Sequence, residues 1–251
     1  MGLDRVKNRN ISIDQNSIQD FYKQRALNRK NIDIDAPVVL CGDKDPDKIS
    51  YWTSYEINHK LKLSQLNGEN KVLELGFGTG RIAKYLIQNS KLYVGIDYVK
   101  ELVDIASSRE DIEKNDDTYF LYGSLQELVG GELHFPNVEF DRFVISGGVL
   151  MYINDDILHE CLKKMLNLFS NKCIMYISEP IAIKERLTLN KFYSDNLGSE
   201  YSAIYRTVGE YNNLFSPFYE AGFKMMLNEE FFTEDIKKQK ETKQWLFILE
   251  R

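Results

Sequence analysis

The chain has 251 residues, of which 43% are hydrophobic, enough to bury a sizeable core in one domain. Its formal net charge is -6, and the Lys and Arg residues are scattered instead of forming the basic stripe typical of nucleic-acid-binding proteins. The charged N-terminus "MGLDRVKNRN" lacks the apolar core of a signal peptide, and no apolar run is long enough to span a bilayer. We therefore expect a cytoplasmic protein that binds neither nucleic acid nor a membrane, and the sequence leaves its oligomeric state open.

Cysteine and histidine spacing predicts no metal site. The cysteines at 41, 161 and 173 form no C-x-x-C motif, and the histidines at 59, 134 and 159 are not spaced as metal ligands. Unpaired cysteines are the usual state in a reducing cytosol.

Along the chain, helical patterns come first and are followed by alternating strands and helices. Residues 1–66 hold helical stretches around "SIQDFYKQRALNR" and "SYWTSYEINHKLKLSQL". Strands are expected at 71–75, 92–97, 118–123, 141–147 and 173–178. Helical patterns follow the first, second and fourth of these strands, and the third crossover predicts only a short helix. This alternation predicts a mostly parallel sheet with helices on both faces.

The last part of the sequence has a different pattern. "GFKMMLNEEFF" (222–232) and "TKQWLFILE" (242–250) predict two strands joined by a polar connector, which favours antiparallel pairing. We expect one domain over 1–251, made of an N-terminal helical cap (1–66), a cofactor-binding core (67–180), a substrate-cap insertion rich in Tyr, Arg and Phe (181–217) and a C-terminal strand pair (218–251).

The stretch "KVLELGFGTGRIAKYL" (71–86) places a glycine turn between the first expected strand and a helix. Glycines allow a tight turn and let a ligand approach the backbone, because no Cβ is in the way. In open parallel sheets, ligands bind at the carboxyl ends of the strands, and Asp97 ends the second strand, placed to accept both hydroxyls of a ribose. The turn therefore predicts a nucleotide-type cofactor site.

The glycine spacing separates two cofactor classes. Dinucleotide folds prefer G-x-G-x-x-G, whereas this chain has E-L-G-x-G-x-G, and Asp97 fits both classes. "VLELGFGTG" resembles motif I of the class I S-adenosylmethionine-dependent methyltransferases, and "VGID" resembles their second motif. The resemblance implies a Rossmann-like α/β fold with a seven-stranded, mostly parallel sheet that ends in an antiparallel pair, plus helical caps. It also implies S-adenosylmethionine as the cofactor and S-adenosylhomocysteine as the product.

The resemblance implies roles for particular residues of the cofactor site. Gly76, Gly78 and Gly80 would line the methionine part of the cofactor together with the backbone of Phe77, and Glu74 would organise the turn and the cofactor amino group. Asp97 would bind the ribose and Tyr98 would pack on the adenine, unless Tyr98 is only a partly exposed aromatic at a helix start. Ser124, followed by Leu125, stands where many members have an acidic residue that reads the adenine amino group, and Ser146 would border the sulfonium.

The acceptor side offers several candidate residues. Tyr152 and Glu179 follow the fourth and fifth strands and are the candidate general bases for a hydroxyl acceptor, whereas an anionic phosphate oxygen needs no base. In the caps, Arg25, Arg186 and Arg206 could bind a phosphate-bearing acceptor, and Tyr22, Tyr201 and Tyr205 could close over cofactor and substrate. The same tyrosines could instead pack cap against core, and the arginines could pair with surface carboxylates.

Negative observations favour a small-molecule acceptor. After the fourth strand the chain reads "SGGVLMY" instead of [DN]-P-P-[YF], which is typical of enzymes that methylate amines of nucleic acids, and it has no Pro-Cys pair. The cap segments "IQDFYKQRA", "ISYWTSYEINHKL", "ISEPIAIKERLTL" and "YSAIYRTVGEY" together resemble small bacterial methyltransferases of capsule and surface-polysaccharide clusters, some associated with O-methyl phosphoramidate decoration.

The cap resemblance implies O-methylation of a phosphate, a phosphoramidate or a sugar-nucleotide precursor in capsular polysaccharide biosynthesis. The alternatives are N- or O-methylation of another small metabolite, a nicotinamide-dependent oxidoreductase (for which a credible Tyr-x-x-x-Lys pair is lacking), a non-catalytic cofactor-binding protein, and aminopropyl transfer on the same fold.

Overall fold

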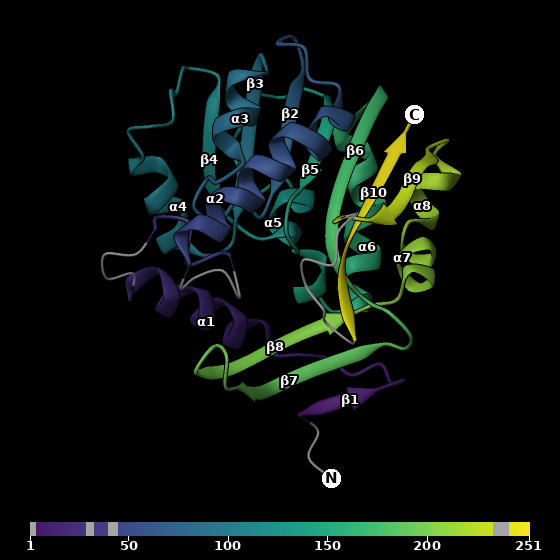
Figure 1. Ribbon diagram of the computed structural model, residues 1–251. Helices are drawn as coiled ribbons and strands as arrows, with labels where there is room; N and C mark the ends of the chain where they lie inside the picture. Colours follow the sequence, from purple (N-terminus) through teal and green to yellow (C-terminus); the bar gives the residue numbers. More distant parts are fainter. Residues whose placement is uncertain (1–3, 29–32, 40–44, 233–240) are drawn as a thin grey trace.

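The computed structural model describes residues 4–28, 33–39, 45–232 and 241–251. Its main sheet has seven strands in the order β4-β3-β2-β5-β6-β10-β9 (Figure 1). The strands are β2 Lys71–Leu75, β3 Leu92–Asp97, β4 Thr118–Tyr122, β5 Phe140–Ile145, β6 Phe169–Ala182, β9 Lys224–Glu230 and β10 Thr242–Glu250. The strands β2 to β6 are parallel, and β10 is antiparallel to both β6 and β9. The expected mostly parallel sheet with an antiparallel C-terminal pair is therefore confirmed.

Helices cover both faces of the main sheet and its end. They are α1 Gln15–Leu27, α2 Pro46–Tyr55, the π-helix η1 Glu56–Lys60, η2 Leu61–Ser64, α3 Ala83–Gln88, α4 Lys100–Ser108, α5 Leu125–Gly130, η3 Leu150–Tyr152, α6 Asp155–Met165, η4 Leu166–Leu168, α7 Val208–Leu214 and α8 Ser216–Glu220. Within the described ranges, no helix has the length and apolar character needed to cross a membrane.

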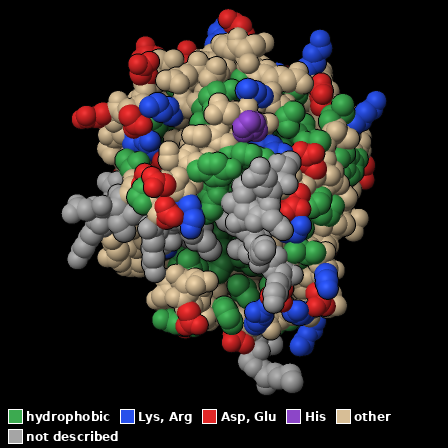
Figure 2. All heavy atoms as spheres, in the orientation of Figure 1, with side chains coloured by type: hydrophobic (Ala, Val, Ile, Leu, Met, Phe, Trp, Pro, Cys, Tyr) green, Lys and Arg blue, Asp and Glu red, His purple; other side chains and the backbone are tan. Residues whose placement is uncertain are grey.

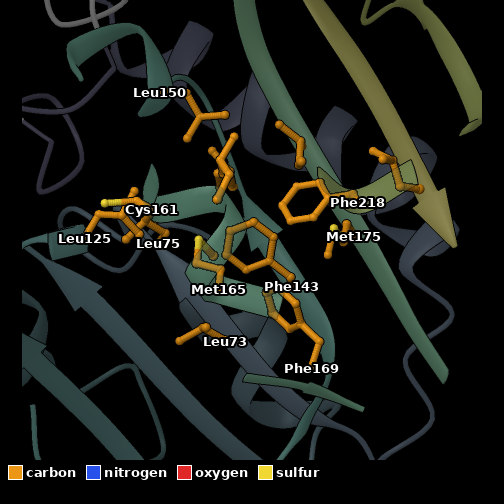
Figure 3. Packing of buried hydrophobic residues seen from close by; sticks show 14 of the residues in the cluster. Leu73, Leu75, Leu125, Phe143, Leu150, Cys161, Met165, Phe169, Met175 and Phe218 are labelled. Carbon is orange, nitrogen blue, oxygen red and sulfur yellow. The ribbon is translucent and has the colours of Figure 1, made fainter. Parts of the chain in front are cut away.

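Alternation along the central strands sends successive side chains to opposite layers of the core. Leu73, Phe143 and Met175 pack with the α5, α6 and α8 side, where Figure 3 shows them among Cys161, Met165 and Phe218. Their neighbours Val72, Val144 and Tyr176 pack with the opposite layer, which holds residues of α3 and η2. Because both faces are buried, the strands read as continuous apolar runs and were easy to predict.

The late insertion, expected as a substrate cap, contains a β-hairpin. β7 (Leu187–Ser194) and β8 (Ser199–Tyr205) pair antiparallel, and β1 (Arg5–Lys7) adds a third strand beside β7. We call this three-stranded sheet the cover sheet. Figure 1 shows it with α1 at one end of the main sheet, and only α7 and α8 of the insertion are helical.

Asn154 and Asp155 stand at the start of α6, where their side chains bind residues of the N-terminal segment and of the insertion. The amide of Asn154 exchanges two hydrogen bonds with the backbone of Ile13, and no side-chain cap bond forms at this helix start. Asp155 pairs with Arg186 and Arg206. These bonds tie the N-terminal segment and the insertion to the start of α6, so the caps are fixed to the core.

Candidate active site

The glycine turn lies between β2 and α3, at the carboxyl end of β2. Gly76, Gly78 and Gly80 all have positive φ angles, of 72°, 59° and 84°, which side chains other than glycine rarely adopt. A Cβ at Gly76 would lie 2.3 Å from Cγ2 of Val149. A Cβ at Gly78 would lie 2.8 Å from Cγ1 of Val38, so the turn requires glycine for both backbone conformation and space.

Asp97 ends β3 beside this turn and is buried. Its Oδ2 accepts a hydrogen bond from the Gly78 N–H, and its Oδ1 accepts one from the Val99 N–H, both at 2.9 Å. Burial raises the pKa of Asp97 to about 6, against the lowering effect of these backbone bonds. Asp97 borders the cavity, so its carboxylate can accept a further hydrogen bond from a ligand there.

Glu74 lies within β2, below the turn. Its side chain is buried, and Oε2 accepts a hydrogen bond from the Tyr93 hydroxyl at 2.6 Å. Burial raises the pKa of Glu74 to about 7. Glu74 borders the cavity, as expected for a group that organises the turn and the cofactor amino group.

At the expected adenine end, Ser124 caps α5. Its hydroxyl and backbone N–H both donate to Glu127, at 2.8 and 2.6 Å, and its Oγ accepts from the Glu127 N–H. The hydroxyl is thus committed to a capping box. Ser124 and Leu125 border the cavity, and the Ser124 backbone is also bonded, its N–H to Glu127 and its carbonyl oxygen to the Leu128 N–H.

Sequence reasoning missed a buried network beside Ser146. Arg81 donates to Oε2 of Glu56 at 2.8 Å and to the Ser146 hydroxyl at 3.0 Å, and Oε1 of Glu56 accepts from Ser146 at 2.6 Å and from Tyr176 at 3.0 Å. Glu56, Arg81 and Ser146 border the cavity. In the sequence, the feature that could have indicated this network is Arg81, a charged residue directly after the third glycine. Glu56 begins the π-helix η1, and π-helical turns are common at functional sites.

Tyrosines gather on the other side of the cavity. The hydroxyl of Tyr152 lies 2.6 Å from that of Tyr22 and 2.7 Å from that of Tyr201, which is also hydrogen-bonded to Tyr205. These residues come from η3, α1 and β8, and all of them border the cavity. Burial raises the pKa of Tyr22, Tyr152 and Tyr201, so these phenols are proton donors at neutral pH.

Glu179 does not border the cavity. It is fully buried, and its carboxylate accepts hydrogen bonds from the N–H groups of Val149, Leu150 and Met151 at 2.6, 2.8 and 3.3 Å and from the Tyr211 hydroxyl at 3.2 Å. Burial raises its pKa to about 7. Its oxygens bind the backbone of the loop after β5, so Glu179 stabilises that loop.

The arginines expected to bind the acceptor also lie away from the cavity. Arg206 is fully buried and bonds to Asp155 and to the carbonyl oxygens of Leu150 and Ile153, at 2.7 and 2.6 Å for the carbonyls. Arg25 donates to the carbonyl oxygens of Ala36 and Pro37. Arg186 pairs with Asp155 and Glu210. All three hold the caps in place.

One cavity of about 420 Å³ connects these groups. Its lining includes Gly76, Phe77, Gly78, Asp97, Tyr98 and Ser124 of the expected cofactor site, together with Arg81, Tyr152, Tyr201 and residues of β7 and β10. Gly80 stays outside it, packed on Ile112 and Ala106. Figure 2 shows hydrophobic side chains gathered near the centre of one face of the molecule. The volume is that of a small-molecule site.

Residues 72–172 match a family model described as a methyltransferase domain. No curated protein matches the chain by sequence. Among solved structures, DhpI in complex with S-adenosylhomocysteine is similar, with a TM-score of 0.61, 14% identity and coverage of 94% of this chain and 96% of that one. A methyltransferase from Leishmania major has a TM-score of 0.61 and 15% identity, with coverage of 94% of this chain and 82% of that one. Magnesium protoporphyrin IX methyltransferase from Synechocystis PCC 6803 has a TM-score of 0.60 and 13% identity, with coverage of 97% of this chain and 100% of that one.

At these identities the structural likeness establishes the fold, a Rossmann-like methyltransferase fold. The domain match over β2 to β6 covers the glycine turn, Asp97 and Ser146. The methyltransferase domain over 72–172 and the shared fold support an S-adenosylmethionine-dependent methyltransferase with S-adenosylmethionine as the cofactor. The oxidoreductase alternative is not favoured. Cys41 lies outside the described residues; in the rest of the chain that the structure describes, no group of Cys, His, Asp and Glu could hold a metal ion.

Proposed function

We propose that the enzyme transfers the methyl group to an anionic oxygen of a small, phosphate-bearing acceptor. The observation that carries the proposal is the part of the cavity lining that the expected cofactor residues leave over, where tyrosine hydroxyls and Arg81 present hydrogen-bond donors. Lys243 also lies there and is paired with Glu230. The carboxylate there, Glu56, is already paired with Arg81 and accepts from Ser146 and Tyr176. Donors surrounding a cavity favour a ligand that brings its own negative charge.

The chemistry agrees with this polarity. S-adenosylmethionine supplies a methyl group on a positively charged sulfur, so the protein must mainly align the acceptor atom and exclude water. A neutral hydroxyl acceptor also needs a general base. Tyr152 keeps its proton at neutral pH because its pKa is raised, and Glu179 is saturated by backbone donors outside the cavity. An acceptor that is already an anion avoids this difficulty.

Different parts of the cavity lining would bind the cofactor and enclose the acceptor. Asp97 and the glycine turn would hold the ribose and the methionine part, and Ser146 would border the transfer point. Side chains of the hairpin β7–β8 and of α1 would cover the acceptor and keep water out. The lining includes Leu189 and Phe192 from β7 and Tyr22 from α1, which supports an enclosing role for both elements.

The narrower proposal is methylation of a phosphoramidate, phosphate or sugar-nucleotide precursor of a bacterial capsular polysaccharide in the cytoplasm. Its support is the resemblance of the four cap segments to methyltransferases of such clusters. The fold also accommodates phosphate-bearing molecules elsewhere. The phosphoethanolamine N-methyltransferase of Haemonchus contortus, 11% identical with a TM-score of 0.64, is described in complex with phosphoethanolamine. N- or O-methylation of another small metabolite is the alternative.

The test is methyl transfer from S-adenosylmethionine to paired acceptors that differ only in the phosphate: a sugar phosphate or sugar phosphoramidate against the free sugar. We expect product only from the phosphate-bearing member, with a rate that is constant above the pH at which the phosphate is fully ionised. Transfer to the free sugar, with a rate that keeps rising with pH, would contradict the proposal and indicate a general base. Asp97→Ala serves as the inactive control.

A further inference from the structure

Tyr98 has a buried hydroxyl that the cofactor role does not explain. Its oxygen has no hydrogen-bond partner among the described residues, although the side chain borders the cavity directly after Asp97. Buried polar atoms are nearly always hydrogen-bonded in native proteins, and a lasting exception at a cavity wall points to a ligand group that completes the bond. Packing of the ring on an adenine would leave this hydroxyl unsatisfied.

Tyr98 packs against the buried cluster that contains Tyr22, Tyr152 and Tyr201, and both Tyr98 and Tyr22 border the cavity. Burial raises the pKa of Tyr98, so its hydroxyl keeps its proton. Tyr22 is one end of the bonded trio Tyr22–Tyr152–Tyr201, in which either oxygen of each pair can donate. Four phenols from α1, the end of β3, η3 and β8 therefore meet at one side of the cavity.

The trio can turn its donors toward a ligand. With the bond between Tyr201 and Tyr205, four hydroxyls carry four protons and share three hydrogen bonds, so one proton is left over. It is on Tyr22 when Tyr205, Tyr201 and Tyr152 each donate to the next hydroxyl toward Tyr22. An anion beside Tyr22 would orient the hydroxyls toward itself, since hydrogen bonds in a chain polarise one another. The phenols keep their protons at neutral pH, because the pKa of each is raised by burial.

We propose that the hydroxyls of Tyr98 and Tyr22 together bind an anionic oxygen of the acceptor, with Tyr152 and Tyr201 aligning the Tyr22 donor. This inference rests on the proposed function and names the acceptor contacts. It gives Tyr98 a role in acceptor binding that its hydroxyl, and not its ring, performs. Tyr22 and Tyr98 thereby take the place of Arg25 and Arg206, which the fold keeps outside the cavity.

The test uses inorganic phosphate as the probe, titrated calorimetrically into the protein saturated with S-adenosylhomocysteine. We expect millimolar phosphate binding that Tyr98→Phe and Tyr22→Phe each weaken by about tenfold or more, the usual effect of losing a hydrogen bond to a charged group. The affinity for S-adenosylhomocysteine should stay within about twofold, because the ring is retained. Tyr193→Phe, on β7 with 59% exposure, is the matched control and should change neither value.

Stability separates this role from a structural one. Tyr98→Phe removes a hydroxyl that has no partner, so the melting temperature of the ligand-free protein should not fall, while the rise caused by phosphate should shrink. Equal phosphate affinity in Tyr98→Phe and the parent would overturn the inference, and so would the absence of phosphate binding to the parent. Failure of the proposed function is a different result, in which phosphate binds through these tyrosines but no phosphate-bearing acceptor is methylated.

Discussion

The carboxylate of Asp97 accepts a hydrogen bond from the backbone N–H of Gly78 at 2.9 Å, across the two adjacent strands β2 and β3. The carboxylate that we propose binds the ribose thus also fixes the middle of the glycine turn. The pair joins the two sequence motifs of the cofactor site into one structural unit. A change at either residue should affect both.

Asp97→Ala should weaken S-adenosylhomocysteine binding by about a hundredfold or more, because two hydrogen bonds to a charged group are lost. Calorimetric titration measures it, and NADH should bind neither protein. The control is Asp104→Ala on α4, where the side chain is 60% exposed. Unchanged binding by the Asp97 variant would mean that the ribose lies elsewhere.

Gly78→Ala should lower both stability and cofactor affinity. The new Cβ would meet Val38 at 2.8 Å, and the positive φ is unfavourable for alanine. Gly131→Ala has a similar φ of 76° but open space around its Cβ, so it should cost only the backbone strain, about 1 kcal/mol. Urea unfolding compares the two variants, and we expect the Gly78 variant to lose about 1–3 kcal/mol more. Equal losses would show that contact with Val38 is unimportant.

Arg206→Met tests whether this arginine is structural. The substitution leaves the carbonyl oxygens of Leu150 and Ile153 without their buried donor and Asp155 with one charge partner fewer. We expect a loss of about 3–5 kcal/mol in the free energy of unfolding. Arg9→Met on the exposed surface should lose almost nothing. A stable Arg206→Met protein that has a raised KM for the acceptor would instead support a substrate contact.

The buried carboxyls predict that stability falls as the pH rises toward neutrality. Burial raises the pKa of Glu74 and Glu179 to about 7 and that of Asp97 to about 6. The folded state therefore binds more protons than the unfolded state between about pH 4.5 and 7, and each group can cost up to about 1.4 kcal/mol per pH unit as it ionises. Urea unfolding of the ligand-free protein from pH 5 to 8 measures the slope.

Glu179→Gln should make that pH dependence shallower, whereas Glu160→Gln, with a side chain 68% exposed, should leave it unchanged. Stability that rises steadily from pH 5 to 7 would contradict the raised pKa values. The carboxyls that ion pairs stabilise do not interfere in this window. Asp111, whose pKa the Arg109 guanidinium lowers, loses its contribution only in more acidic solution.

The sheet was predictable because its information is local. Runs such as "KVLEL" and "TKQWLFILE" are apolar, bounded by polar residues, and became β2 and β10 at the expected residues. Gly76, Gly78 and Asp97 were equally readable, because the turn needs glycine and the carboxylate ends a strand. The helix after the turn begins at Ala83, because the turn extends past the third glycine.

The caps were less predictable because their partners are remote in sequence. Leu187 and Leu189 alternate with polar residues ahead of the turn at Gly198, a hairpin signal that the composition of the insertion obscured. The duties of Glu179 and Arg206 depend on backbone groups about 30 and 50 residues away, which no local pattern reports. Charged residues among apolar neighbours suggested a catalytic or substrate-binding role, whereas Glu179 and Arg206 bind the backbone of the loop after β5.

The pairing of β1 with β7 sets the order in which the enzyme can mature on the ribosome. Arg5 faces Leu189 across this ladder, so residues made at the start must wait for residues made roughly 10 to 40 s later at ordinary rates of synthesis. The glycine turn and Asp97 emerge well before that moment. The residues of the glycine turn and Asp97 are therefore made before the cover sheet beside them can form.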